Sequence, residues 1–389
     1  MGFDGADIDG LLQTAVEAGT WHGVVAVVVD RDGVLHETCA GQASPETMFR
    51  NASMTKAVAT TAALQLVEQG RLELDATVES VLPEFAELQL IEGYDGDRPI
   101  LRPPASKPTF RQLMTHTAGL GYFFVNQRLF DYLSATGLPS PLDGKRTSLD
   151  APLVNDPGTV WEYGVNTDWL GLAIERITGQ SLSAYVTEHV YGPLGMVDST
   201  FYPSAEQRAR LLPIMMRAAD GSLEPTDIDL PDDPEWDAGG HGSYGTARDY
   251  ARFVRAWLRD GELDGERILT PETVELAFSD HIEGVALPEL MTSCMPELSN
   301  DVPTLPVPQG WGLGFHLMKV DLPGMRSAGT GGWSGIFNTY YWIDRSAGIG
   351  GVIMTQVLPF FDARIIETVL GFEMAVYAQV GAAVPAVAG

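Results

Sequence analysis

The sequence predicts an α/β (α+β) fold, in which an antiparallel sheet flanked by helices is formed by both ends of the chain and a mostly helical lobe is inserted between them. Three observations support this prediction: strand patterns lie near both termini, helical patterns separated by Pro- and Gly-rich loops fill the middle, and no internal repeat breaks this order. Antiparallel pairing of the two groups of strands would bring the chain ends together. We place the sheet domain in residues 1–71 and 236–389, and the lobe in residues 72–235.

The first two strands form a predicted hairpin. The stretches "VVAVVV" (24–29) and "VLHETCA" (34–40) are strand-like, and the "DRDG" between them supplies turn-forming Asp and Gly. A helical pattern over 6–18 precedes the hairpin, and another over 51–70 follows it. The second helix should end at Gly70, because glycine readily adopts the left-handed conformation that closes a helix.

The remainder of the chain alternates helices and loops and then returns to strands. Helices are predicted over 109–115, 166–178, 181–190, 246–261 and 362–379, and strands over 311–320, 336–343 and 349–356. A long Pro-rich connection over 284–309 has two open interpretations: it forms a lid over a pocket, or it wraps the surface.

Charge excludes several classes of partner. The chain of 389 residues has 52 acidic and 24 basic residues, a net charge of -28, so its surface should repel nucleic acid and anionic membranes. No basic segment followed by an apolar run opens the chain, so no secretory signal is predicted and a cytoplasmic location is expected. The two cysteines, Cys39 and Cys294, are too few for a disulfide framework, which favours small buried hydrophobes over a bridge.

Ser53 and Lys56 are candidate catalytic residues in the helix over 51–70. Positions three apart share a helix face, so the amine can reach the hydroxyl. A hydroxyl is a poor nucleophile until a base takes its proton, and the N–H groups at a helix start can stabilise the oxyanion formed on an attacked carbonyl. The alternative is a packed serine beside a lysine that extends to solvent.

Two further stretches carry candidate residues. Tyr163 follows a Pro-Gly turn in "PGTVWEYGVNTDWLG" (157–171), where its phenol can act as a proton relay beside the charge of Lys56; the alternative is a packed aromatic ring. The glycine-dense "SAGTGGWSGIFNTYYWID" (327–344) runs into a strand, and glycine in a strand marks close approach of a ligand or backbone. An N–H group there can supply a second oxyanion donor, unless the stretch is simply a tight turn or bulge.

Together and in this order, "SMTK", "YGVN" and "GTGGWSG" resemble the serine hydrolases related to class C β-lactamases and penicillin-binding proteins, most of all the family VIII carboxylesterases. The resemblance covers nearly the whole chain and includes "LMTHTAGL" (113–120), "YGPLGM" (191–196) and "HGSYGTARDYARF" (241–253). It implies a β-lactamase/transpeptidase-like fold with the site between sheet and lobe, and no metal or organic cofactor.

The resemblance also implies roles for individual residues. Ser53 would be the acylated nucleophile, and Lys56 and Tyr163 its base and proton shuttle. Binding of the oxyanion or substrate would fall to residues of the glycine-dense stretch and to a pocket tyrosine; these are Gly331, Gly332, Trp333, Gly335 and Tyr122. His116, in contrast, is expected to be structural and to fix its loop.

Two departures from the family pattern bear on the substrate. Val165 stands where lactamases and peptidases usually have Asn, and Asn166 falls one position later. Gly329 stands where their K-T-G or H-T-G strand has a basic residue that would pair with a substrate carboxylate. Both departures favour neutral esters over anionic β-lactams or D-peptides.

We therefore predict an esterase of the EC 3.1.1 type that acts on a small-molecule ester or acyl donor. Acyl transfer to a metabolite hydroxyl or amine is the first alternative, β-lactam or D-amino-acid peptide hydrolysis the second, and a binding relative without turnover the third. An α/β-hydrolase is disfavoured because the chain has no G-x-S-x-G, and a metallohydrolase because it has no H-E-x-x-H or Cys/His cluster.

Overall fold

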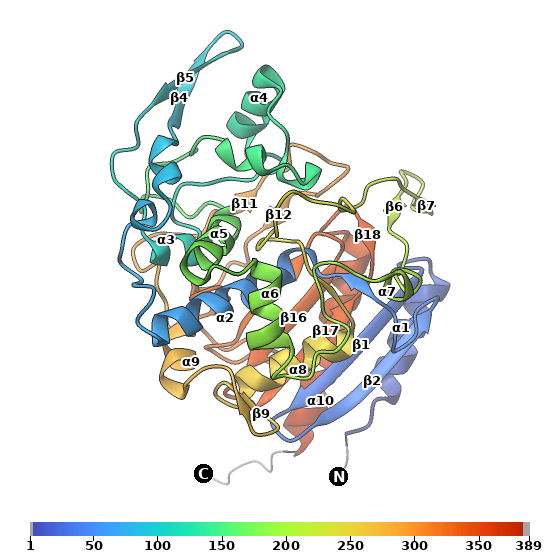
Figure 1. The fold of residues 1–389 in the computed structure, drawn as a ribbon. Coiled ribbons are helices and arrows are strands. Elements are labelled where there is room, and N and C mark those ends of the chain that lie inside the picture. The colour runs from blue at the N-terminus through green and yellow to red at the C-terminus, as the bar shows by residue number, and fades with distance from the viewer. Residues whose placement is uncertain (1–2, 384–389) are drawn as a thin grey trace.

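A seven-stranded antiparallel sheet, drawn from both ends of the chain, lies at the centre of the molecule (Figure 1). The computed structural model describes residues 3–383. Strand β1 (Gly23–Asp30) pairs with β17 (Ile349–Met354), with Val27 opposite Val352, so the predicted union of N- and C-terminal strands is confirmed. The order is β13-β14-β15-β16-β17-β1-β2; the other strands are β2 (Val34–Gly41), β13 (Gln309–Trp311), β14 (His316–Met318), β15 (Gly331–Gly335) and β16 (Thr339–Asp344).

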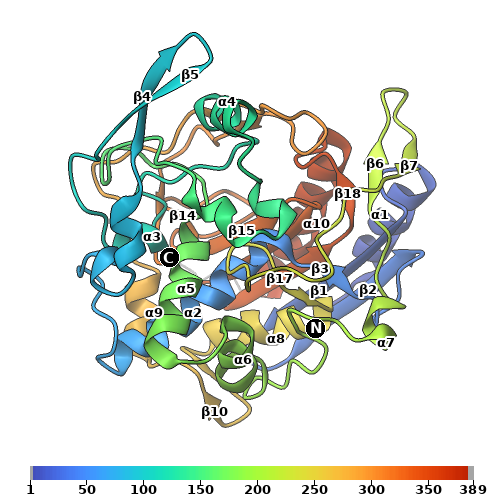
Figure 2. The same cartoon turned by 45° about the horizontal axis from the view of Figure 1, so that its top comes forward.

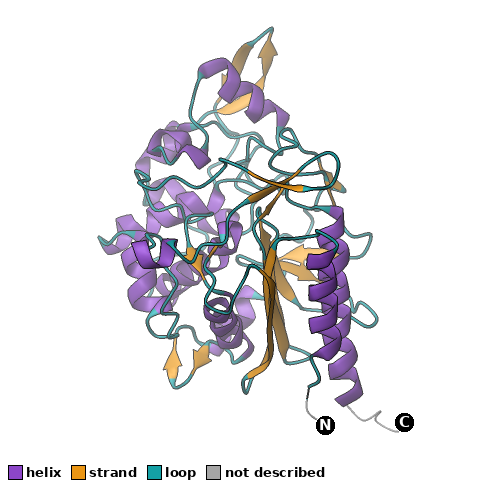
Figure 3. Cartoon of the chain, turned by 90° about the vertical axis from the view of Figure 1, so that its right-hand side faces the viewer, coloured by secondary structure: helices purple, strands orange, loops and turns teal. Residues whose placement is uncertain are grey.

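The two faces of the sheet are both covered, which explains the continuous apolar run of β1. Side chains alternate along a strand, so Val25, Val27 and Val29 enter one core while Val24 and Val28 enter another. The second core is closed by two helices that pack on each other, α1 (Ala6–Glu17) and α10 (Ala363–Ala383). Figure 3 shows two long helices on one side of the sheet and the remaining helices on the other.

The opposite face carries α8 (Ala247–Leu258) and the inserted lobe. The lobe contains α3–α7 but also a projecting hairpin of β4 and β5, seen at the top of Figure 2. The helices are α2 (Thr55–Glu68), α3 (Phe110–Met114), α4 (Gln127–Thr136), α5 (Asn166–Thr178), α6 (Leu182–Val186), α7 (Ala205–Arg208) and α9 (Pro271–Ala277). Short 3-10 turns lie at Ala52–Met54, Val78–Ser80, Pro83–Glu87, Pro141–Asp143 and Arg146–Asp150.

The remaining strands are short and lie outside the main sheet. Strand β6 pairs with β18, so this part of the predicted lobe is joined to the C-terminal region. The pairs are β3 (Phe49–Arg50) with β8 (Tyr244–Gly245), β4 (Leu90–Asp95) with β5 (Arg98–Arg102), β6 (Met215–Arg217) with β7 (Leu223–Pro225) and β18 (Val357–Leu358), β9 (Glu262–Leu263) with β10 (Glu266–Arg267), and β11 (Leu290–Met291) with β12 (Val302–Pro303).

Local differences from the predicted elements have physical causes. The single strand predicted over 311–320 is a hairpin of β13 and β14, because Gly314 has φ +85 and the Gly312 N–H turns back to the Phe315 carbonyl. The helix predicted over 181–190 is α6 followed by a π turn over Thr187–Tyr191. Gly70 has φ +65 and ends α2 as expected. Cys39 and Cys294 are free and half-buried, and across residues 3–383 no helix is both long and apolar enough to cross a bilayer.

Candidate active site

Ser53 lies in the 3-10 turn that leads into α2, not in the α-helix itself. The preceding Ala52 has φ 46, a left-handed conformation that is uncommon for a residue with a side chain. Thr55 anchors the turn to Ser243. Its hydroxyl forms a hydrogen bond with the Ser243 hydroxyl at 2.8 Å and accepts one from the Ser243 N–H at 3.1 Å. Ser53 is thereby held half-buried, with its side chain at a cavity.

Lys56 does not extend to solvent, so the structure contradicts the alternative in which it is an exposed surface lysine. Its side chain is buried, and its Nζ donates to Ser53 Oγ at 3.1 Å, to the Tyr122 hydroxyl at 3.1 Å and to the Gly240 carbonyl at 2.8 Å. These three acceptors match the three N–H bonds of an ammonium group. The amine is therefore fixed beside the hydroxyl that it was predicted to activate.

Asp168 is a member of this network that the sequence analysis missed. It lies on α5 with no exposed surface; one oxygen accepts the Gly240 N–H at 2.7 Å and the other the Tyr122 hydroxyl at 3.4 Å. Burial raises the pKa of Asp168 to about 6, against the opposing effects of Lys56 and these hydrogen bonds. The available signal was an acidic residue inside the apolar helix "DWLGLAI" (168–174), which required a buried partner.

Two histidines near this network are uncharged. Burial and the charge of Lys56 lower the pKa of His241 to about 3, and the same two causes hold the pKa of His116 well below its usual range. His116 Nδ1 lies 2.9 Å from the Asn166 amide nitrogen, which also donates to the Leu120 carbonyl at 3.4 Å. This contact agrees with the structural role expected of His116, and it keeps the Asn166 amide away from the cavity.

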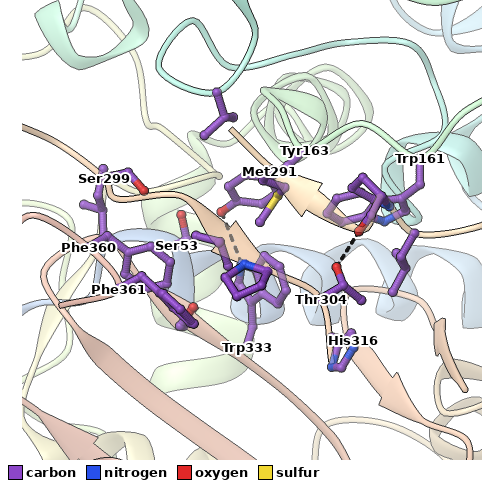
Figure 4. A pocket seen from close by; sticks show the side chains of 18 of the residues that line it. Ser53, Trp161, Tyr163, Met291, Ser299, Thr304, His316, Trp333, Phe360 and Phe361 are labelled. Atoms are coloured by element: carbon purple, nitrogen blue, oxygen red, sulfur yellow. Dashed lines mark hydrogen bonds between the residues drawn. The ribbon is translucent and has the colours of Figure 1, made fainter. Parts of the chain in front are cut away.

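Tyr163 lines the same cavity as Ser53 (Figure 4). Its hydroxyl accepts a hydrogen bond from Trp333 Nε1 at 3.2 Å, and Lys56 Nζ lies 4.8 Å from the centre of its ring. Within residues 3–383 this hydroxyl forms no hydrogen bond with Ser53 or Lys56; the direct bond to the amine is made by Tyr122 instead. Tyr122 is thus a member of the lysine network and not only a pocket residue.

Only part of the glycine-dense stretch over 327–344 lines the cavity. Trp333 and Gly335 line the cavity, together with Ser334, whereas Gly331 and Gly332 do not. A Cβ on Gly331 would lie 2.6 Å from Phe278, and one on Gly332 would lie 2.5 Å from the Tyr341 carbonyl, so these glycines permit tight packing within the sheet. The wall opposite Ser53 is therefore residues 333–336, displaced toward the C-terminus from the expected position.

Two residues of the cavity lining have a main-chain N–H group without an acceptor among the described residues. Across the described residues, neither the Ser53 nor the Ile336 main-chain N–H has a main-chain or side-chain acceptor, and both residues line the cavity. Ser53 lies at the start of a helix, where such groups are free, and Ile336 is the first residue of the turn after β15. Ile336 is a second site residue that the sequence analysis missed, because only the register of β15 reveals it.

The cavity itself has a volume of about 220 Å³ and no charged residue in its lining. Its floor contains an aromatic cluster in which the Trp311 ring lies 4.9 Å from Trp161 and 4.7 Å from Trp333. The connection over 284–309 contributes several lining residues, among them Met291, with which β11 ends, so this segment borders the cavity. The lining comprises Ser53, Phe124, Val125, Trp161, Tyr163, Leu287, Pro288, Met291, Ser299, Val302, Pro303, Thr304, Leu305, Gln309, Trp311, His316, Trp333, Ser334, Gly335, Ile336, Tyr340, Phe360 and Phe361.

A sheet built from both chain ends, an inserted lobe and a serine–lysine pair between them define a class of protein. A profile of the Beta-lactamase family matches residues 8–371, and the chain belongs to this family. It is 35% identical to monacolin J acid methylbutanoyltransferase of Aspergillus terreus over 349 residues, which are 86% of this chain and 83% of that one. It is 30% identical to lovastatin esterase of Penicillium rubens over 90% of this chain and 93% of that one.

Solved structures agree with these relationships. Simvastatin synthase (LovD) from Aspergillus terreus matches with a TM-score of 0.84 and 30% identity, over 96% of this chain and 97% of that one. EstCE1, described as a hydrolase with promiscuous acyltransferase activity, matches with a TM-score of 0.75 and 25% identity, over 96% and 98%. These matches confirm the predicted β-lactamase-like fold and the predicted membership of this serine hydrolase superfamily.

Proposed function

We propose that the protein cleaves neutral carboxylic esters through an acyl-enzyme on Ser53. The observation that carries this proposal is the buried Lys56 amine, bonded to Ser53 Oγ at 3.1 Å beside a cavity whose lining has no charged residue. Such a lining suits an uncharged substrate, since a buried anion without a partner is costly. The same reasoning disfavours β-lactams and D-peptides, whose carboxylate needs a cationic partner.

Each residue has a defined step in this reaction. Lys56 as a neutral amine, or Tyr163 as a phenolate, accepts the proton of Ser53 as Oγ attacks the ester carbonyl, and the N–H groups of Ser53 and Ile336 stabilise the oxyanion. Tyr163 then protonates the departing alkoxide, and Trp333 Nε1 stabilises the negative charge left on the phenol oxygen. Water attacks the acyl-enzyme with the proton transfers reversed, which releases the acid and restores Ser53.

Acyl transfer is the second candidate, because the size and apolar lining of the cavity suit an acceptor alcohol as well as water. Relatives of both kinds support this: the Aspergillus terreus relative is named a methylbutanoyltransferase and the Penicillium rubens relative an esterase. Both activities share the acyl-enzyme and differ only in which nucleophile discharges it.

The test is to trap the intermediate. After incubation with p-nitrophenyl butyrate, intact-mass and peptide analysis should locate a butyryl group on Ser53, and Ser53→Ala should lower p-nitrophenol release at least about 1000-fold. Ser346→Ala, at an exposed turn between β16 and β17, is the control and should retain activity. Butyrylation of another residue would refute the proposal.

Adding acceptor alcohols separates the two activities. An alcohol that fills the cavity should divert the butyryl group into a new ester if transfer occurs, whereas only butyrate forms if the protein is purely a hydrolase. The ratio of new ester to butyrate measures this partition directly.

A further inference from the structure

A second, smaller cavity also reaches Ser53. It has a volume of about 40 Å³, against about 220 Å³ for the large cavity, and the two share Ser53, Phe124 and Ile336. The large cavity and the small cavity therefore meet at the nucleophile and at the second unpaired N–H group.

We infer that the small cavity holds the acyl group of the substrate and the large cavity its alcohol. This inference rests on the proposed acyl-enzyme on Ser53. A carbonyl whose oxygen lies between the Ser53 and Ile336 N–H groups has two substituents that diverge, one toward each cavity. The two cavities must then divide the acyl chain from the leaving group.

The position of the general acid decides which substituent takes which side. The leaving oxygen needs a proton, and Tyr163 lines the large cavity but not the small one. Tyr122 does line the small cavity, but its hydroxyl accepts from Lys56 Nζ at 3.1 Å and donates to Asp168 at 3.4 Å. Its proton is committed to a buried carboxylate, so the alcohol must leave through the large cavity.

The walls of the small cavity define the chemistry of the acyl group. Leu142, Ile228 and Leu298 present aliphatic side chains, and His241 is uncharged because burial lowers its pKa. The one charged residue in the lining, Asp229, forms a bidentate ion pair with Arg50. The Nε and Nη2 atoms of Arg50 each donate to one carboxylate oxygen at 2.5 Å, so the charge of Asp229 is neutralised. An apolar acyl chain is therefore favoured over a hydroxylated or charged one.

The volume limits the length of that chain. One water-sized group needs roughly 10–15 Å³ of such space, so the small cavity admits about three carbon groups beyond the carbonyl. The predicted substrate class is thus an ester of a short apolar acid, of about four carbons, with a larger apolar alcohol. Longer acyl chains overfill the cavity and displace its walls.

A pair of isomeric esters tests the assignment on the unaltered protein. Octyl butyrate and butyl octanoate have the same composition but exchange the sizes of acid and alcohol. We expect kcat/KM to favour octyl butyrate by at least about tenfold. Equal rates, or a preference for butyl octanoate, would overturn the assignment.

Variants of residues that line only one of the two cavities provide the matched comparison. In a series of p-nitrophenyl esters, kcat/KM should rise about fourfold per methylene up to butyrate and then fall. Leu298→Ala, which enlarges only the small cavity, should move this optimum to longer acids, and Ile228→Phe should move it toward acetate. Leu287→Ala, which enlarges only the large cavity, should leave the optimal acyl chain length unchanged. A shift of this optimum in Leu287→Ala, with none in the two small-cavity variants, would refute the inference.

Mass analysis of Ser53 separates this inference from the function on which it rests. If neither isomer acylates Ser53, the proposed function fails. If both acylate Ser53 but the longer acid reacts as fast or faster, only the assignment of the cavities fails.

Discussion

Lys56 is a buried amine that touches no carboxylate directly within residues 3–383. Its positive charge is balanced by Asp168 indirectly, through two groups that lie between them. The Tyr122 hydroxyl accepts from Lys56 Nζ and donates to Asp168, and the Gly240 residue accepts from Lys56 Nζ through its carbonyl and donates to Asp168 through its N–H. A buried charge without such compensation is strongly unfavourable. We therefore expect Asp168 to be a positioning residue that keeps Lys56 Nζ beside Ser53.

Asp168→Asn should lower kcat by roughly 10- to 100-fold with little change in KM, because the amide keeps the shape but removes the charge. In the unaltered protein, activity should decline as pH falls through about 6, where the raised pKa of Asp168 lets it take up a proton and release the Tyr122 hydroxyl. The variant should lack this decline. Profiles of kcat/KM against pH on a neutral ester, from about pH 5 to pH 8, test both points; an unchanged decline would assign it to another group.

The same carboxyl makes the opposite contribution to stability. Burial raises the pKa of Asp168 from 3.8 to about 6, so between these values the native state binds a proton that the unfolded chain does not. The cost of burying the carboxylate is fully present above about pH 6 and is relieved as pH falls from about 6 toward 3.8. At this residue, activity and stability have opposite dependences on pH.

At the scale of elements, β15 and the Ser53 turn are set by one close approach. A Cβ on Gly335 would lie 2.6 Å from the Asn51 carbonyl oxygen and 2.4 Å from Thr339 Oγ1. Gly335→Ala should push the wall of the cavity away from Ser53 and lower kcat by at least about tenfold, since misplacement by 1 Å costs much of catalysis. Gly93→Ala, where a Cβ meets nothing within 4 Å, is the control. Assays paired with thermal melts check the result; equal activity in both variants would contradict it.

The elements that the sequence predicted well are those with strong local patterns. The hairpin over 24–40, the helix ending at Gly70 and the turn with Ser53 and Lys56 follow from strand propensity, helix spacing and one closing glycine. Which glycines of 327–344 meet the cavity depends instead on the register of β15 against β16, with Gly335 opposite Thr339. Register is a tertiary property, so Ile336 escaped prediction.

The same distinction explains the misplaced tyrosine contacts. Tyr122 and Tyr163 lie in separate stretches of sequence, but a hydrogen bond from the Tyr122 N–H to the Tyr163 carbonyl at 3.0 Å holds the two stretches together, and the Tyr122 hydroxyl is the one that accepts from Lys56 Nζ. The sequence pairs Lys56 with Tyr163 and places Tyr122 only in the pocket, because sequence spacing does not show which phenol contacts the amine. The candidate roles assigned to Ser53, Lys56 and Tyr163 remain predictions, and the experiments above test them.

On the scale of the whole molecule, joining both chain ends in one sheet makes the fold depend on distant contacts. Strand β1 pairs with β17 across more than three hundred residues, so the contact between Val27 and Val352 closes a loop that contains the whole intervening lobe. Contacts so far apart in sequence carry a large loop-closure entropy. The site inherits this dependence, because Ser53 and the 333–336 wall come from opposite ends of the chain.

The net charge of -28 acts on this whole assembly. Like charges spread over one surface repel each other and favour the unfolded chain, whereas exposed ion pairs such as Lys145–Glu235 contribute little. Salt screens both effects, with a screening length near 10 Å at about 0.1 M, so relief of repulsion should dominate. We expect the Tm to rise by about 2 °C or more between roughly 10 mM and 150 mM NaCl. Calorimetry in NaCl and in KCl checks this, since screening predicts the same shift in Tm in both salts. A fall in Tm with added salt would mean that the ion pairs contribute more stability than the excess charge removes.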